Sequence, residues 1–366
     1  MRALALLLVT SFLAAPVSAA LVDDLREAKK LVRRLERDEP EGYEALIDDL
    51  LDDLDGRVEG EVRAATVAID LHAPSIPRAE RAARRATGRH DRSGDAASRR
   101  KRLRLLRKAA TGARRTFRLL RRRSPDEATA LKQPVATIPD DRIDEGSGLA
   151  WWHGAFWTMN DGGGQAVLFR SETADFAEST MVPVPGATNV DWEDLAVHEG
   201  DLVVADVGDN GRTRDDLVLY RVTFDGAALT LAATWRISYP DGPHDVEAVV
   251  SIDGALHAIT KDRGEGTLVY RFADLREGIV NVGEFLGAIP LGTEGEKATA
   301  ADVDAERGEL VVLTYVGVHF LDPADLGSGP VRSLPFFGLQ AEGIAVAGDL
   351  IVITNEQRQV FAALRR

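Results

Sequence analysis

Five short segments of the chain resemble one another and carry an oxygen-bearing side chain at the same position. The aligned residues are Ser147, Glu193, Glu247, Thr299 and Glu342. If the fold brings them together, three crowded carboxylates repel one another and lose hydration unless they are protonated or share a cation. Calcium fits these oxygen donors better than magnesium, which needs a strict octahedron, or zinc, which prefers nitrogen and sulfur. The pattern therefore predicts a calcium site.

The spacing of these segments indicates the elements that would position the five residues. The copies begin roughly 43 to 54 residues apart, and each is followed by short apolar runs separated by turns rich in Gly, Asn and Asp. This period is typical of a four-stranded propeller blade. Residues 134–366 are therefore predicted to form a five-bladed β-propeller, with the first strand of each blade lining a central channel.

The last copy reaches the C-terminus without a fourth strand, whereas a spare strand at residues 135–138 precedes the first copy. We expect the spare strand to complete the last blade and close the ring, which leaves no open sheet edge. The five aligned side chains then meet on the axis. The alternative is that the acidic ones only accept hydrogen bonds from backbone amides of the next blade.

The order Ser, Glu, Glu, Ser/Thr, Glu is similar to the axial ring of the soluble calcium-activated nucleotidases (apyrases), and the five residues match it one by one. The segments at 147–149 and 342–344 also resemble the SdiA-regulated propellers of bacteria. The resemblance covers about residues 134–366 and implies axial calcium and phosphoric-ester hydrolysis. In the nucleotidases the first hairpin is followed by an acidic-acidic-basic loop, where this chain has Asn160, Asp161 and Gly162. That departure argues against nucleotidase activity.

Polar loops are expected to surround the channel mouth, where a propeller usually binds its ligand. The predicted rim consists of Asn160, Asp161, Asp191, Asp206, Asp209, Asn210, Lys261, Arg263, Asn355 and Glu356. Asp161 and His244 are the candidates for catalysis by acid–base chemistry.

The first 20 residues have the features of a cleavable secretory signal: Arg2, an apolar run at residues 3–9, and small residues at 17–19. An uncleaved anchor is the alternative. With the signal removed, we expect no transmembrane span and a periplasmic or extracellular location. The chain contains no Cys, which excludes disulfides and thiolate metal sites.

Residues 21–125 are predicted to be helical. Apolar residues recur at helical spacing over 21–35, 46–54, 62–71 and 103–120, and residues 88–98 are predicted to form a loop. Residues 78–123 contain 19 Lys and Arg but 3 Asp and Glu, whereas residues 134–366 contain 16 and 38. This basic segment could bind an anionic envelope surface, or the acidic propeller could partly neutralise it. Nucleic acid is not expected as a partner, because no aromatic or base-reading motif accompanies the charge.

Taken together, these patterns predict a mainly β protein, a five-bladed propeller preceded by an N-terminal α-helical region. We expect an exported, calcium-centred binding or scaffold module with an unknown ligand. The alternative is a calcium-dependent phosphoric-ester hydrolase similar to the apyrases.

Overall fold

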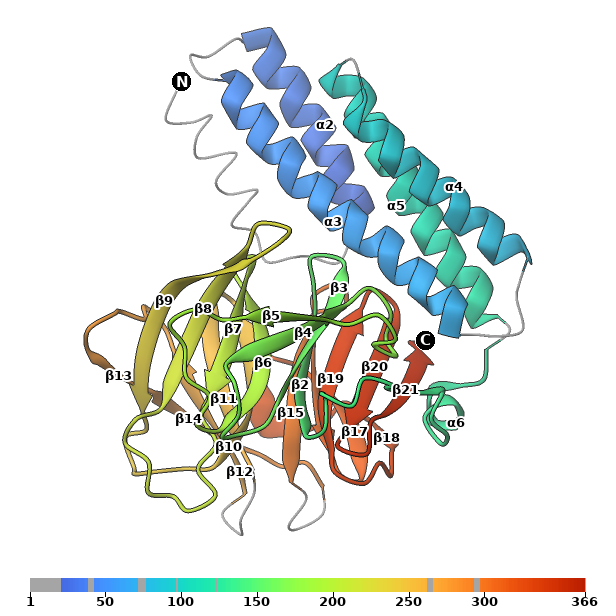
Figure 1. Ribbon diagram of the computed structural model, residues 1–366. Coiled ribbons are helices and arrows are strands. Elements are labelled where there is room, and N and C mark those ends of the chain that lie inside the picture. Colours follow the sequence, from blue (N-terminus) through green and yellow to red (C-terminus); the bar gives the residue numbers. More distant parts are fainter. Residues whose placement is uncertain are drawn as a thin grey trace.

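The computed structural model describes residues 21–38, 43–71, 77–96, 98–122, 124–261, 266–292 and 297–365. A bundle of long helices precedes a β-propeller (Figure 1). The predicted signal at residues 1–20 lies outside the described residues. Within them, no helix combines the length and the apolar character that crossing a membrane requires.

The propeller has five sheets, as the repeat predicts. The first blade contains β2 (Gly146–Trp152), β3 (Ala155–Asn160), β4 (Val167–Ser171) and β5 (Thr180–Pro183). The second contains β6 (Trp192–His198), β7 (Asp201–Asp206), β8 (Val218–Phe224) and β9 (Leu229–Ser238). The third contains β10 (Val246–Ile252), β11 (Ala255–Thr260), β12 (Thr267–Phe272) and β14 (Glu284–Ile289). The fourth contains β15 (Ala298–Asp304), β16 (Glu309–Thr314), β17 (Gly317–Leu321) and β18 (Arg332–Pro335).

The fifth blade is built from both ends of the propeller. It contains β19 (Ala341–Ala347), β20 (Leu350–Asn355) and β21 (Gln359–Leu364), and β1 (Ala136–Thr137) pairs with β21 as its outer strand. The Val135 and Ile138 N–H groups donate to the Val360 and Arg358 carbonyls, each over 2.7 Å. The predicted closure of the ring is therefore confirmed. A further strand that the sequence did not reveal, β13 (Val280–Val282), pairs in parallel with β9.

Each inner strand contains a β-bulge at or beside the predicted ring position. In β6, Trp192 pairs with Asp206 and Asp194 with Ala205, so Glu193 is the extra residue. Glu247, Thr299 and Glu342 hold the same place in their strands, and in β2 the extra residue is Gly148, next to Ser147. Because a bulge changes the direction of a side chain, the repeat sets the orientation of this layer as well as its position.

The bundle contains four long helices and is followed by a short helix. They are α2 (Leu21–Asp38), α3 (Tyr43–Leu71), α4 (Pro77–Gly94), α5 (Arg99–Arg121) and α6 (Glu127–Ala130). Two predictions are wrong here. The apolar runs at 46–54 and 62–71 belong to one continuous helix, and most of the predicted loop at 88–98 is helical.

The contact between α4 and α5 explains the second error. Ala79, Ala82, Ala83 and Ala86 form the buried face of α4, and small side chains give only a weak signal in the sequence. A Cβ atom at Gly112 of α5 would lie 2.9 Å from the Ala86 Cβ atom. The two helices are close because neither has bulk at this point, and burial of the alanine face keeps α4 helical.

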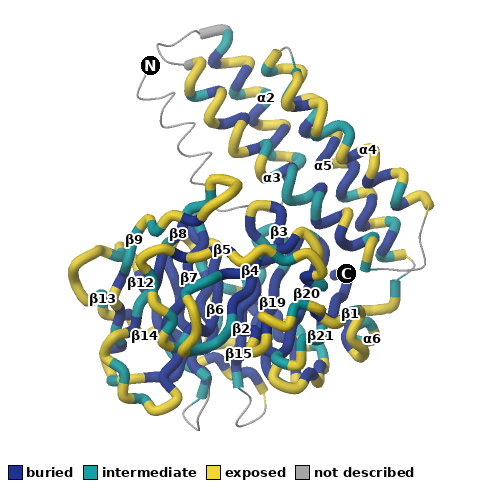
Figure 2. The backbone as a smooth tube through the Cα atoms, viewed as in Figure 1, coloured by how far each residue is buried: buried dark blue, intermediate teal, exposed yellow. Residues whose placement is uncertain are grey.

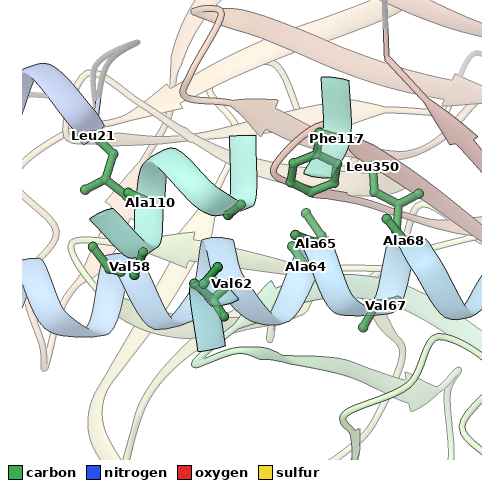
Figure 3. Packing of buried hydrophobic residues seen from close by; sticks show 14 of the residues in the cluster. Leu21, Val58, Val62, Ala64, Ala65, Val67, Ala68, Ala110, Phe117 and Leu350 are labelled. Carbon is green, nitrogen blue, oxygen red and sulfur yellow. The ribbon is translucent and has the colours of Figure 1, made fainter. Parts of the chain in front are cut away.

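The bundle packs on one end of the propeller (Figures 1 and 2). Phe117 of α5 lies against Gly348, in the turn between β19 and β20, and Figure 3 shows it near Leu350 and Ala65. Arg114 of α5 forms an ion pair of 2.7 Å with Glu306, in the turn between β15 and β16. These turns follow the inner strands, so the end at which the inner strands begin faces away from the bundle. We call that end the mouth face.

Candidate cation site at the mouth face

The five inner strands contact one another in the order β2, β6, β10, β15, β19 and back to β2. All five predicted ring residues on these strands are buried. The two hydroxyls, however, bond to the backbone of a neighbouring strand. Ser147 Oγ donates to the Glu193 carbonyl over 2.8 Å, and Thr299 Oγ1 donates to the Ala341 carbonyl over 2.6 Å. These two hydroxyls therefore join neighbouring blades by hydrogen bonds.

Two of the three ring carboxylates have partners within the protein. The Lys261 ammonium, directly after β11, lies 2.7 Å from Glu247 Oε1. Burial, the largest single influence, acts to lower the pKa of Lys261, but the charge and hydrogen bond of Glu247, with the nearby Tyr315 and Glu342, together raise that pKa, which keeps the lysine charged. The Tyr315 hydroxyl donates to Glu342 Oε1 over 2.9 Å. The protein itself thus supplies a cation to one carboxylate and a hydrogen bond to another.

Glu193 is different. Its side chain is buried, and no hydrogen bond within the described part of the chain reaches its carboxylate. Burial raises its pKa well above the usual range, and the negative charges of Glu247, Asp161 and Asp191 raise it further. A buried carboxylate without a hydrogen-bond partner is costly, by roughly 1–3 kcal/mol or more. Among the described residues, Glu193 is the one ring member whose side chain lacks a hydrogen-bond or ion-pair partner.

Glu193, Asp161 and Asp191 form a cluster of three carboxylates. Asp161 follows β3, Asp191 precedes β6, and one oxygen from each residue lies within 4.8 Å of the others. Burial, together with the charge of Asp161, raises the pKa of Asp191 to about 6. Oxygens bound to one calcium ion lie at most about 5 Å apart, whereas those on one magnesium ion lie at most about 4 Å apart. The upper limit of 4.8 Å on the separations in the cluster lies within the span of one calcium ion.

Two glycines let the loops close around this cluster. A Cβ atom at Gly208 would overlap Glu193 Oε1 and lie 2.6 Å from Asp191 Oδ2. A Cβ atom at Gly162 would lie 2.5 Å from Asp191 Oδ1. Any other residue at either position would push the carboxylates apart.

Asp206 and Asp209, predicted as rim residues, are buried and hold the loops in place. Asp206 accepts hydrogen bonds from the N–H groups of Val190 (3.2 Å) and Asp191 (3.0 Å), and Arg214 donates to it over 2.8 Å. Asp209 accepts from the N–H groups of residues 213 and 214. Asp206 therefore fixes the position of Asp191, whereas Asp209 orders the loop at residues 213 and 214.

The other predicted rim residues are spread over the face. Asn160 donates to the Arg142 carbonyl and to Asp144, and its own Oδ1 is buried without a partner. Asn355 is buried and bonded to Gln359, while Glu356 accepts from Gln340. Asn210 is exposed, and Arg263 lies outside the described residues.

His244, the second catalytic candidate, is buried in an aromatic cluster. Its Nε2 atom lies 2.8 Å from the Tyr270 hydroxyl and 3.1 Å from Asp241 Oδ1, and its ring packs near Tyr239. It is absent from the carboxylate cluster, which contains the other candidate, Asp161.

Two acidic residues that sequence reasoning missed connect the inner strands. Asp194 Oδ2 accepts hydrogen bonds from the N–H groups of Val249 (2.9 Å) and Ala301 (3.4 Å), in two other blades. Asp302 Oδ2 accepts from the Val346 N–H over 2.7 Å. Burial raises the pKa of Asp302 to about 7 and that of Asp194 well above its usual range. The alternative role considered for the ring, bonding to backbone amides of other blades, belongs to these residues. The sequence feature that could have revealed this role is an Asp inside an otherwise apolar inner strand.

A groove of about 350 Å³ borders the Asn160–Asp161 loop. Its lining combines polar and apolar side chains: Arg142, Asn160, Gly164, Gln165, Val167, Phe169 and Met181. Its volume is at the lower end of the range for small-molecule sites. None of the three cluster carboxylates lines this groove, which reaches the loop that carries Asp161 only through Asn160 and Gly164.

No protein-family model and no curated protein sequence matches the chain. Among solved structures, the chain is similar to one described as the Dos1 propeller, at 14% identity and a TM-score of 0.33, over 59% of this chain and 55% of that one. It is also similar to the Myceliophteria thermophila Cps50 (Swd1) β-propeller domain, at 11% identity and a TM-score of 0.35, over 63% and 68%. The chain spans about half the length of the first of these proteins.

Proposed function

We propose that the propeller is a binding module whose mouth face holds one calcium ion through Asp161, Asp191 and Glu193. The observation that carries this proposal is the Glu193 carboxylate, which is buried, lacks a hydrogen bond and lies beside two further carboxylates. A divalent cation would offset the repulsion among the three and satisfy Glu193.

Of the five predicted ring residues, this ligand set includes Glu193 alone. The other four are not ligands in it. Ser147 and Thr299 bond to carbonyls, Glu247 to Lys261, and Glu342 to Tyr315. The proposed ion is therefore displaced from the axis toward the loops of the first two blades. Three carboxylates leave several of the six to eight calcium positions open. We infer that these positions bind an anionic group of a ligand that extends into the neighbouring groove.

Hydrolysis of a phosphoric ester has less support. It would require free cationic side chains to bind the phosphate oxygens beside the ion. Near the cluster, Lys261 is paired with Glu247, and Arg214 is paired with Asp206 and Asp216. We keep export to the periplasm or medium as part of the proposal, because extracellular calcium modules work at about 10⁻⁴–10⁻³ M calcium.

Calorimetric titration with calcium and with magnesium tests the site. We expect one calcium ion per chain in the wild type, weaker magnesium binding, and no calcium binding in Glu193→Gln. Glu145→Gln, an exposed neighbour of the mouth face, is the matched control and should bind normally. Glu342→Gln separates the two candidate sites, since it leaves the proposed cluster intact but removes a ligand of the axial ring.

Absence of calcium binding in the wild type, or unchanged binding in Glu193→Gln, would overturn the proposal. Loss of calcium binding in Glu342→Gln would show that the ion binds at the axial ring instead. Phosphate release from a nucleotide or phenyl phosphate by the calcium-loaded protein, abolished in Asp161→Asn, would favour the hydrolase.

A further inference from the structure

The outer face of α5 carries a regular row of positive charge. Its positions are three and four residues apart, and all of them are exposed. They are Lys101, Arg104, Lys108, Thr111, Arg115, Arg118 and Arg122. We call this row the α5 stripe. Six of its seven members are cationic, and the whole helix contains no acidic residue.

Within the described residues, no acidic group of the chain neutralises the stripe. Five other cations of α5 form ion pairs with nearby acidic side chains. These pairs are Arg99 with Asp48, Arg100 with Glu36, Arg102 with Asp52 and Asp55, Arg114 with Glu306, and Arg121 with Asp349. The six cations of the stripe have no ion pair or hydrogen bond from their side chains to any described residue. The propeller thus balances only two cations of α5, and the stripe retains its charge.

The neighbouring helix extends this basic surface. Arg78, Arg81, Arg85 and Arg92 of α4 are exposed and follow the same spacing, with Gly88 at the fourth position of the series. Because α4 packs along α5, the two rows belong to one side-by-side pair of helices (Figure 1). The opposite members of the bundle, α2 and α3, contain most of its acidic residues.

We propose that this surface docks the protein on a membrane rich in anionic phospholipid. Guanidinium groups match phosphate oxygens, and a cluster of four to eight cations on a helix is enough to bind acidic headgroups. The stripe extends over about 30 Å, given 1.5 Å per residue, and contains no apolar side chain that would enter the hydrocarbon. Contact is therefore with headgroups only.

Two observations favour a membrane over nucleic acid. Single strands are bound by exposed aromatic side chains, and Phe117, the only Phe, Tyr or Trp on α4 and α5, is buried. A duplex groove accepts a protruding helix, whereas α5 is contacted by α2, α3 and α4 and leaves one face exposed. A long exposed row of cations suits an extended anionic surface better.

Docking through the stripe would also orient the molecule. The bundle packs on the end of the propeller opposite the mouth face, and residues 134–366 carry a net charge of −22 (16 − 38). An anionic surface attracts the bundle and repels the propeller. The mouth face would therefore point away from the membrane, toward its ligand.

Vesicle sedimentation with the full chain tests the proposal. We expect binding to vesicles containing 30% phosphatidylglycerol, weak binding to pure phosphatidylcholine, and loss of binding as salt rises from 50 to 300 mM. A fourfold variant, Arg104→Gln, Lys108→Gln, Arg115→Gln and Arg118→Gln, should bind about a thousandfold more weakly. The neutral vesicles report any binding that residues 1–20 contribute.

A matched variant controls for net charge. Lys30→Gln, Arg33→Gln, Lys132→Gln and Arg276→Gln remove four exposed cations outside the stripe and should leave binding almost unchanged. Circular dichroism melting verifies that both variants fold. Equal loss of binding in the two variants, or none in the stripe variant, would overturn the proposal. So would tighter binding of an RNA or DNA oligonucleotide than of acidic vesicles.

Discussion

The mouth face and the α5 stripe are both concentrations of like charge, but they differ in burial. At the mouth face, Glu193 is buried and Asp191 is half-buried, and burial raises the pKa of each. Along the stripe, the arginines and lysines are exposed. Buried like charges cost stability until a counter-charge arrives, whereas exposed ones are hydrated and screened by salt. The mouth face is therefore stabilised when a cation binds. The α5 stripe is stable without a partner and attracts one by its charge.

The largest effect is expected at Lys261, the internal cation of the mouth face. Lys261→Met leaves Glu247 buried without its partner and should destabilise the metal-free protein by about 3 kcal/mol. Calcium should restore part of this loss, since it adds a positive charge next to the same carboxylates. Urea unfolding with and without calcium measures both effects. Lys132→Met, on the surface, should change stability by less than about 0.5 kcal/mol; a similar loss there would remove the role assigned to burial.

A smaller effect is expected at Gly208, where the loop touches the cluster. The Cβ atom in Gly208→Ala would displace the Glu193 and Asp191 carboxylates and should weaken calcium binding about 10- to 100-fold. Gly164→Ala is the matched control, because its Cβ atom would meet only Asn189 Nδ2, at 4.0 Å. Titration calorimetry compares the two. Equal affinities would mean that the loop does not shape the site.

The contact between bundle and propeller contains a half-buried acid, Glu61, that makes stability depend on pH. Burial, together with the nearby Glu306 carboxylate, raises the pKa of Glu61 to about 8. Its contribution is complete below the unfolded-state pKa of about 4.5 and is lost as pH rises through about 8. Unfolding free energy should fall by roughly 2 kcal/mol between pH 6 and 8. Glu61→Gln should remove this slope, and an unchanged slope would assign it to other groups.

The smallest effect is expected from the stripe itself. Arg104→Gln and Lys108→Gln should each change the free energy of unfolding by less than about 0.5 kcal/mol, because both side chains are exposed and unpaired. A slight stabilisation would follow from reduced repulsion along the helix. Urea unfolding at low salt measures it. A decrease of more than 1 kcal/mol in the free energy of unfolding would show that the stripe stabilises the fold. The contrast between a buried mouth face and a merely exposed stripe would then be wrong.

Much of the propeller was predictable because its signal is repeated. The spacing of the five aligned residues indicates five blades, and the spare strand before Ser147 indicates how the ring closes. The helix α4 was missed because its buried face is made of alanines and its interior contains Gly88. Such a helix is maintained by packing on α5, which the sequence pattern does not reveal.

The residues of the candidate site could be predicted from the sequence, but not which of them lie together. Asp161, Asp191 and Glu193 were all expected near the mouth, but on different parts of it. Their convergence depends on two loops that approach closely at Gly162 and Gly208. The partners of the remaining ring carboxylates come from different places: Lys261 follows the strand paired with that of Glu247 in the same blade, whereas Tyr315 follows β16 of the blade next to that of Glu342. Each contact depends on a register that a bulge shifts, which a linear pattern does not show.

A melting curve after chelation, with calcium or magnesium then added back, tests whether the mouth face binds calcium. Saturating calcium should raise the midpoint by roughly 5 °C, and magnesium by less. Glu193→Gln should melt at or above the metal-free wild type, because it lacks the unpartnered charge, and should not respond to calcium. If calcium leaves the wild type unchanged, or shifts Glu193→Gln equally, the mouth face does not hold the ion.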